Sequence, residues 1–314
     1  MSSSEPLDIK NYIGLTSDTP IRFIASDVDG TLVNDAKSVD PEVVSAVRAA
    51  RESGIRVAIA SGRAWHEMDD VIDAMPCLRY FVCTNGAYVM DKEEQKELVH
   101  ISLDKTRAID LVRKLMTYGV FVEAYVKAEI FGQYPTVGNE TLQSEHFFRA
   151  NIRPFILKTR TMVPDLLAHL ESLPEGPEKI QIFYGDERIR ERILADLRDD
   201  FQGAATDDKG RERFYDVLES SEGNLEFVLP HTTKGTAVEA LANHWGYTPD
   251  EVMTIGDSEN DLSMIRFAGA SVAMGNARDN VKAAARYETT DNNNYGVARA
   301  LYSAIAHNRE LEGK

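Results

Sequence analysis

The sequence predicts an α/β protein whose doubly wound, Rossmann-like parallel sheet is interrupted by a second domain. Near both ends of the chain, short apolar segments alternate with segments of helical periodicity, and this alternation favours a parallel sheet flanked by helices. Between these regions, strands follow one another with fewer helices, which is typical of an antiparallel α+β domain. The 314 residues are enough for two such domains.

The first part of the parallel sheet is expected at residues 21–87. Asp40 and Pro41 supply an N-cap and a first-turn proline for the first helix, and Gly54 ends it. The expected elements are a strand from Ile21, a helix over residues 41–53, a strand over Ile55–Ala60, a helix ending near Ala74 and a strand over Tyr80–Cys83.

The middle region, placed at residues 88–226, is expected to be an inserted α+β domain. Its elements are a hairpin from Tyr88, a helix over Asp104–Tyr118, strands over Val120–Val126, Lys179–Tyr184, Arg213–Leu218 and Leu225–Leu229, and a charged helix over about Glu187–Asp199. Because the parallel pattern returns afterwards, the first domain is expected to be discontinuous.

The second part of the parallel sheet is expected at residues 227–314. The pattern predicts a helix from Lys234 to about Trp245, a strand over Val252–Ile255, a helix over Leu262–Ala268, a strand over Ala270–Met274 and a last helix from near Tyr295. Residues 1–20 begin with serines and are expected to form a flexible N-terminal tail.

Composition excludes several classes of protein. The net charge of −16, from 51 acidic and 35 basic residues, argues against nucleic acid or an anionic membrane as a partner. No apolar run is long enough to span a membrane, and the N-terminus does not resemble a secretory signal. Cys77 and Cys83 suggest neither a disulfide framework nor a zinc site. We therefore expect a cytoplasmic protein, a monomer or small homo-oligomer.

Polar residues stand after the predicted strands and at one helix start, and together they suggest phosphoryl transfer. Asp27 and Asp29 follow the first strand, and two carboxylates so close repel each other unless a proton or a cation such as Mg²⁺ relieves them. Ser61 follows the second strand, Asp257 follows a later one, and Lys234 opens a helix, where an anion is favoured. These residues are candidates for a nucleophile, an acid, a metal site and a phosphate contact.

The chain resembles the haloacid dehalogenase superfamily of phosphohydrolases, in the Cof-like branch with a large α/β cap. Four segments match the family motifs in order: DVDGT from Asp27, ASGR around Ser61, Lys234-Gly235, and GDSENDLSM from Gly256. The tail from Gly269, GASVAMGNARDNVKAAA, is also similar to that branch. The resemblance covers residues from Ile21 to about Leu301, and across the cap it depends mainly on size and element order.

The resemblance implies a role for each carboxylate. Asp27 would attack phosphorus and also bind Mg²⁺. Asp29 would act as general acid and then base, and its backbone carbonyl would contact the metal. Asp257 would be a further metal ligand, and Asp261 would orient Lys234 or metal-bound water, although helix capping is a competing interpretation for Asp261.

The remaining motif residues would hold the phosphoryl group. Ser61, the Gly62 N–H and Asn260 would contact it, and Lys234 would neutralise both the phosphoryl group and the nucleophile. Ser61 stands where the family often has Thr, which keeps the hydroxyl. Tyr295 stands where the branch often has Asp, which affects only a peripheral contact.

The resulting hypothesis is a Mg²⁺-dependent phosphatase that hydrolyses small phosphomonoesters, sugar phosphates above all, through an aspartyl-phosphate. A sugar phosphomutase is one alternative, kept open by the basic residues Arg149, Arg153, Lys158 and Arg160 of the cap. The other is a catalytically silent sugar-phosphate-binding regulator, although both the nucleophile and the acid are present. A small phosphorylated metabolite is the expected partner in each case.

Overall fold

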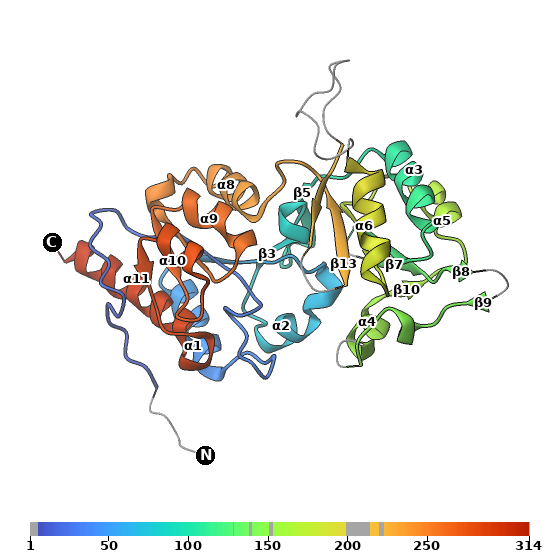
Figure 1. Ribbon diagram of the computed structural model, residues 1–314. Coiled ribbons are helices and arrows are strands. Elements are labelled where there is room, and N and C mark those ends of the chain that lie inside the picture. Colours follow the sequence, from blue (N-terminus) through green and yellow to red (C-terminus); the bar gives the residue numbers. More distant parts are fainter. Residues whose placement is uncertain are drawn as a thin grey trace. The chain divides into compact units, whose positions relative to one another are not determined.

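The computed structural model describes residues 6–127, 129–137, 140–150, 153–198, 214–219 and 223–313. The chain forms two compact units. The first unit comprises Met1–Arg63, Met68–Val99 and Thr233–Lys314, and the second comprises Ala64–Glu67 and His100–Thr232. Figure 1 shows the course of the chain through both units.

The first unit is built on an eight-stranded sheet in the order β16-β15-β14-β1-β2-β3-β4-β5. Its strands are β1 Phe23–Ser26, β2 Arg56–Ala60, β3 Tyr80–Cys83, β4 Tyr88–Asp91, β5 Lys96–His100, β14 Val252–Gly256, β15 Ala270–Ala273 and β16 Tyr287–Glu288. Neighbours from β16 to β3 are parallel, whereas β3 and β4 are antiparallel. Phe23 lies opposite both Val252 and Arg56, so β1 occupies the centre of the sheet.

Helices pack on the sheet of the first unit from both sides, which completes the doubly wound arrangement (Figure 1). They are α1 Pro41–Glu52, α2 Asp69–Ala74, α8 Lys234–His244, α9 Leu262–Phe267, α10 Asp279–Ala284 and α11 Gly296–Glu312. Helix α8 packs against α9, and α1 packs against α11. Residues of β1 and β2 share an apolar cluster with α8, because alternate strand residues point to the same face.

The second unit contains a six-stranded sheet in the order β10-β7-β6-β11-β13-β12, which is antiparallel except for the pair β10-β7. Its strands are β6 Phe121–Val126, β7 Glu129–Gln133, β10 Thr161–Met162, β11 Lys179–Phe183, β12 Asp216–Leu218 and β13 Asn224–Val228. A separate hairpin joins β8 Thr136–Val137 to β9 Glu140–Thr141. The helices are α3 Lys105–Met116, α4 Arg153–Thr159, α5 Leu166–Ser172 and α6 Glu187–Asp196.

The two faces of this second sheet differ in polarity. On one face Val122, Ile180 and Phe227 belong to an apolar cluster shared with α3, α5 and α6. On the other face the same strands carry buried polar side chains: Glu123, Tyr125, Lys179, Gln181, Asn224 and Glu226. Because strand residues alternate between faces, a shift of one residue in register would exchange these two sets.

The predicted fold class is confirmed, whereas some predicted boundaries differ from the observed ones. Residues 88–99 were expected in the inserted domain but belong to the first unit, because β4 pairs with the edge of its sheet. Within the expected tail, Leu15 is buried and the Ile13 N–H donates to Ser303 Oγ of α11. The predicted ends at Asp199 and Arg213 and the tail residues 1–5 lie outside the described residues.

In the described part of the chain no helix combines the length and the apolar composition that crossing a membrane requires.

Candidate active site

The predicted active-site residues of the first unit gather where its parallel strands end. Lys234, the first residue of α8, is 1% exposed and lies between two buried carboxylates. Its Nζ is 2.6 Å from Asp27 Oδ1 and 2.7 Å from Asp261 Oδ1. The first turn of α8 can pack closely against α9 because Gly235 has no Cβ. A Cβ at this residue would stand 2.5 Å from the carbonyl carbon of Ser263. The sequence therefore brings together three motifs from distant parts of the chain.

The side chain of Asp257 lies beside Gly30, which follows Asp29 in the loop after β1. Gly30 has φ +78°, and a Cβ at that residue would be 2.5 Å from Asp257 Oδ2, so both the backbone conformation and the space require glycine. The Thr31 hydroxyl donates to Asp257 Oδ1 at 3.2 Å. The DVDGT segment thus positions a carboxylate that is 226 residues away in sequence.

The electrostatics of this cluster favour an additional cation. Burial and the charge of Asp261 raise the pKa of Asp27 well above its ordinary value, although Lys234 acts in the opposite direction. Burial and Asp261 also raise the pKa of Asp257 to about 6. Burial alone would lower the pKa of Lys234, but the charges of Asp261 and Asp27 outweigh it and raise that pKa. One ammonium group is therefore too little charge for these carboxylates.

The same residues suit a divalent metal ion. Asp27, Asp257 and Asp261 each offer a carboxylate oxygen within 4.8 Å of the others. Asp261 is the weakest ligand of the three, because its Oδ2 accepts the N–H groups of Asp257 and Ser258 while its Oδ1 accepts Lys234. Asp27 and Asp257 fit an oxygen-ligated ion such as Mg²⁺.

Asp29 lies beside this cluster but is held by other residues. Arg63 donates to it twice, from Nη2 to Oδ1 at 2.7 Å and from Nε to Oδ2 at 2.8 Å. Lys37 Nζ adds a third contact at 3.2 Å. Burial alone would raise the pKa of Asp29, but the Arg63 hydrogen bonds and both positive charges outweigh it and lower that pKa. In this arrangement Asp29 is a carboxylate, so donating a proton requires that Arg63 release it.

The predicted phosphate contacts lie on neighbouring loops. Ser61 is buried after β2, and its Oγ accepts the Arg63 N–H at 3.1 Å. A Cβ on Gly62 would be 3.1 Å from Asn85 Oδ1, and the same Oδ1 accepts from Asn260 Nδ2 at 3.3 Å. Asn85 therefore connects the Gly62 loop with the Asn260 loop.

Sequence reasoning missed several residues of this site. Thr31 and Asn276, which donates to the Gly30 carbonyl at 2.7 Å, were not predicted as site residues. Arg63 lies in the matched ASGR segment, but its contact with Asp29 was not predicted. Thr31 belongs to the DVDGT motif and Asn276 to the tail segment from Gly269, so both lie in matched segments, but the contact of Asn276 with Gly30 spans 246 residues and is not evident from the sequence.

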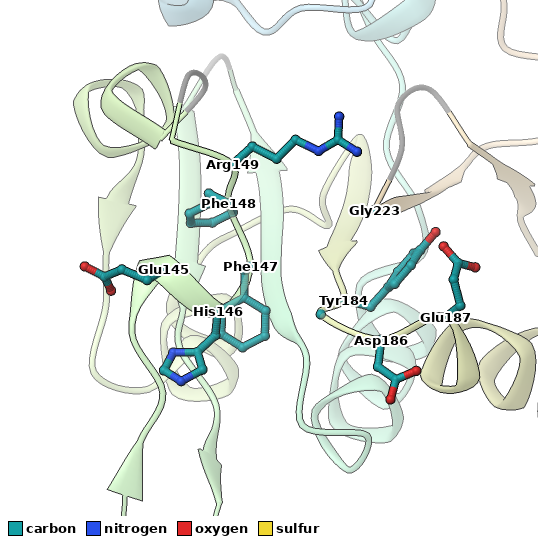
Figure 2. A pocket seen from close by; sticks show the side chains of 10 residues that line it. Glu145, His146, Phe147, Phe148, Arg149, Tyr184, Asp186, Glu187 and Gly223 are labelled. Carbon is teal, nitrogen blue, oxygen red and sulfur yellow. The ribbon is translucent and has the colours of Figure 1, made fainter.

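A hollow lies within the second unit, and no residue of the four motifs lines it. It encloses about 400 Å³ between the segment Glu145–Arg149 and the segment Tyr184–Glu187. Figure 2 shows Phe147 and Tyr184 on opposite sides of it, with Asp186 and Glu187 at the start of α6. Of the aromatic side chains in this unit, Phe147 and Phe148 line this hollow, whereas Phe131 packs in the apolar cluster under α3 and α5.

Comparison with known proteins identifies the family. The family model of haloacid dehalogenase-like hydrolases matches residues 24–301. The phosphatase YwpJ of Bacillus subtilis (strain 168) is 30% identical over 295 residues, covering 90% of this chain and 99% of the relative. A 5-amino-6-(5-phospho-D-ribitylamino)uracil phosphatase of the same organism, YcsE, is 28% identical over 284 residues, covering 90% and 96%.

The fold has solved counterparts as well. The crystal structure of a haloacid dehalogenase-like hydrolase from Bacteroides thetaiotaomicron matches with a TM-score of 0.74 and 28% identity, over 90% of this chain and 98% of that one. The chain thus belongs to the Cof-like branch of the haloacid dehalogenase-like hydrolases and is a phosphoric monoester hydrolase.

Proposed function

We propose that this protein is a Mg²⁺-dependent phosphatase that hydrolyses small phosphomonoesters, sugar and polyol phosphates above all, through an aspartyl-phosphate on Asp27. The observation that carries the proposal is the position of Lys234, whose Nζ is 2.6 Å from Asp27 Oδ1 in a buried site at the strand ends. A lysine there favours the anionic form of Asp27, against the burial that raises its pKa, and places positive charge where a phosphate would arrive.

The proposed reaction has two steps. First, an Asp27 carboxylate oxygen attacks phosphorus, the ester P–O bond breaks, and Asp29 gives a proton to the leaving alkoxide. Next, water attacks the aspartyl-phosphate while Asp29 takes a proton from it, so that inorganic phosphate leaves and Asp27 is regenerated. Ser61, the Gly62 N–H and Asn260 would hold the phosphoryl oxygens during both steps.

Asp27 and Asp257, with the Asp29 backbone carbonyl, would hold the Mg²⁺ ion. When bound, the ion would supply positive charge for the phosphoryl oxygens. Asp261 is proposed as a positioning residue, because its two oxygens accept Lys234 and the N–H groups of the following loop. This arrangement keeps Lys234 pointed at Asp27 rather than toward solvent.

The proposed substrate class is supported by a relative rather than by a described pocket. The name of YcsE specifies a ribityl phosphate, which is the phosphate ester of a polyol. The phosphomutase alternative needs cap cations for a second phosphate. One of its four residues, Arg160, already contacts Glu123 and Glu67, and Arg153 lies 3.5 Å from Glu145. Hydrolysis is therefore preferred to transfer.

The test is release of inorganic phosphate by the purified protein from a panel of sugar phosphates, polyol phosphates, nucleotides and flavin mononucleotide. Release is expected with Mg²⁺ and not with a chelator, and sugar or polyol phosphates are expected to be the best substrates. No Mg²⁺-dependent release from any member would refute the proposal. A requirement for a sugar bisphosphate, with an isomerised sugar phosphate as product, would favour the mutase.

A further inference from the structure

Four residues that follow the candidate phosphate loop in sequence pack with the second unit. Residues Ala64–Glu67 come directly after the Ser61-Gly62-Arg63 segment, yet they cluster with the second unit rather than the first. Ala64 shares a buried apolar cluster with Tyr125 and Ile130 of that unit. The chain therefore passes from one unit to the other between Arg63 and Ala64.

Arg160, which follows α4, holds this segment through a saturated set of hydrogen bonds. Its side chain is 2% exposed, and its Nη1 donates to Glu67 Oε1 at 2.5 Å. The other donors reach Thr159 Oγ1 from Nη1, Glu123 from Nε and Nη2, and the Tyr125 hydroxyl from Nη2. A guanidinium has five N–H bonds, and each has an acceptor here.

Glu67 transmits this hold to the backbone. While its Oε1 accepts Arg160, its Oε2 accepts the Ala64 N–H at 2.8 Å, and the Glu67 N–H donates to the Ala64 carbonyl at 3.1 Å. This pair of bonds closes the first turn after Arg63 in the manner of an N-terminal helix cap. The side chain of Arg160, which also contacts Glu123 and Tyr125 of β6, thus holds the backbone turn that follows Arg63.

The residues before this turn belong to the proposed chemistry. Arg63 makes a two-point contact with Asp29, the proposed acid, and its N–H donates to Ser61 Oγ. The Thr84 N–H donates to the Arg63 carbonyl at 2.9 Å, so the backbone of Arg63 is also tied to β3's end within its own unit. The turn that begins at Ala64, directly after Arg63, is closed by Glu67.

We propose that Arg160 is a positioning residue for catalysis, which acts through Glu67 to fix the Ser61-Gly62-Arg63 loop. This inference rests on the proposed phosphatase function. Arg160 contacts two buried carboxylates, Glu67 and Glu123, and only a guanidinium offers enough directed donors for both together with the two hydroxyls. Loss of these donors removes the bond to Glu67 Oε1, and the bond from the Ala64 N–H to Glu67 Oε2 is then expected to weaken.

The first measurement follows the backbone and needs no turnover. In the Arg160→Gln variant, amide hydrogen exchange in a peptide spanning residues 61–68 is expected to be at least about 10-fold faster than in the original protein. Glu67→Ala should produce the same acceleration, since it removes the other end of the contact. Leu170→Ala, which truncates a buried residue of α5 on the opposite face of the sheet, should destabilise the second unit without this local effect.

The second measurement is steady-state kinetics with the best phosphomonoester. Arg160→Gln is expected to lower kcat by about 10- to 100-fold with KM changed by less than about threefold, because misplacement of about 1 Å has effects of that size. Arg160→Lys, which keeps the charge and loses the fork, should recover kcat only partly. The double variant of Arg160 and Glu67 should be no slower than either single variant, as expected for residues that act as one.

The outcomes separate the two proposals. If the original protein releases no phosphate, the proposed function fails, and the exchange measurement still tests the Arg160 contact. If Arg160→Gln folds and exchange at residues 61–68 and kcat both stay within about twofold of the original, the inference is wrong. If that variant does not fold, unchanged exchange and kcat in both Arg160→Lys and Glu67→Ala overturn it. A loss of kcat equal to that of Leu170→Ala indicates general destabilisation and also overturns it.

Discussion

Each unit of this protein contains a cation that is buried between two carboxylates, and the two clusters are built differently. In the first unit Lys234 lies between Asp27 and Asp261, while in the second unit Arg160 lies between Glu123 and Glu67. All of these side chains are less than 8% exposed. The two clusters differ in the number of carboxylates around the cation and in whether every N–H of the cation has an acceptor.

The Lys234 cluster has more negative charge than its cation can neutralise. A third carboxylate, Asp257, lies within 4.8 Å of Asp27 and Asp261, and the pKa values of Asp27 and Asp257 are raised. Around Arg160, each guanidinium N–H has an acceptor, and the acceptors include two hydroxyls that add no charge. An under-compensated cluster is suited to binding and chemistry, whereas a saturated one is suited to holding structure.

The largest effect is expected when a carboxylate of the Lys234 cluster is replaced: Asp27→Asn should lose turnover. The amide cannot attack phosphorus, so phosphate release should fall by at least about 10³-fold. Thermal stability should be unchanged or higher, because a desolvated carboxylate with a raised pKa is removed. The exposed Asp18→Asn serves as control and should keep full activity. A substantial fall in melting temperature for Asp27→Asn would contradict the description of this cluster as under-compensated.

The matching change in the second unit is Glu123→Gln, which should have the opposite effect on stability. Both carboxylate oxygens of Glu123 accept hydrogen bonds from Arg160, and Oε1 also accepts one from the Tyr125 hydroxyl. In a glutamine, the NH₂ group would replace one of these oxygens and its N–H bonds would face the N–H bonds of Arg160. We expect the free energy of unfolding to fall by about 2–3 kcal/mol, as for other hydrogen bonds to charged groups. Urea unfolding of this variant beside Asp27→Asn measures the contrast. Equal stability in both variants would show that the two clusters do not differ.

The sequence reveals the Lys234 cluster more readily than the Arg160 cluster for a physical reason. Residues that do chemistry stand at strand ends and helix starts, where loop motifs such as DVDGT have a local pattern. Gly30 is an example, since both its positive φ and its contact with Asp257 are fixed by the motif. The Arg160–Glu67 contact joins residues 93 positions apart in segments with no such pattern, so the sequence does not disclose it.

The fold was predicted well where periodicity alone determines it and less well at the junction. The hairpin after Tyr88 was assigned to the inserted domain because strands follow one another there, but an antiparallel strand can also extend the edge of a parallel sheet, as β4 does. Nothing local to that segment distinguishes the two possibilities. The junction at Arg63 is likewise decided by the packing of Ala64 and Glu67, which depends on distant residues.

Adding Mg²⁺ should sharpen the contrast by stabilising the Lys234 cluster, which has a third carboxylate, and not the Arg160 cluster. A ligand at about 100 times its Kd stabilises the folded state by about 2.7 kcal/mol, which should appear as a higher melting temperature. Asp257→Asn should lose most of this shift, because it removes a proposed ligand. The control is Glu259→Gln, which removes an exposed acid from the same loop and should keep the shift. A Mg²⁺ shift that is the same in Asp257→Asn would place the ion elsewhere.

The smallest effect is expected at a third charged group, Asp91 at the end of β4, which lies outside both clusters. Arg79 donates to it at 2.7 Å, and Oδ1 also accepts the N–H groups of Glu93 and Glu94. Burial alone would raise the pKa of Asp91, but these bonds outweigh it and lower that pKa. Because the folded pKa lies below that of the unfolded chain, about 3.9, the stability that Asp91 contributes is present above pH 4 and is lost as the pH falls further.

Asp91→Asn should cost about 1 kcal/mol of unfolding free energy at pH 7, a value reduced by the partial exposure of Arg79. In urea unfolding from pH 7 to pH 3, the gap between Asp91→Asn and the original protein should stay constant to about pH 4 and then narrow. A gap that widens on acidification would mean that the pairing with Arg79 does not lower the pKa of Asp91.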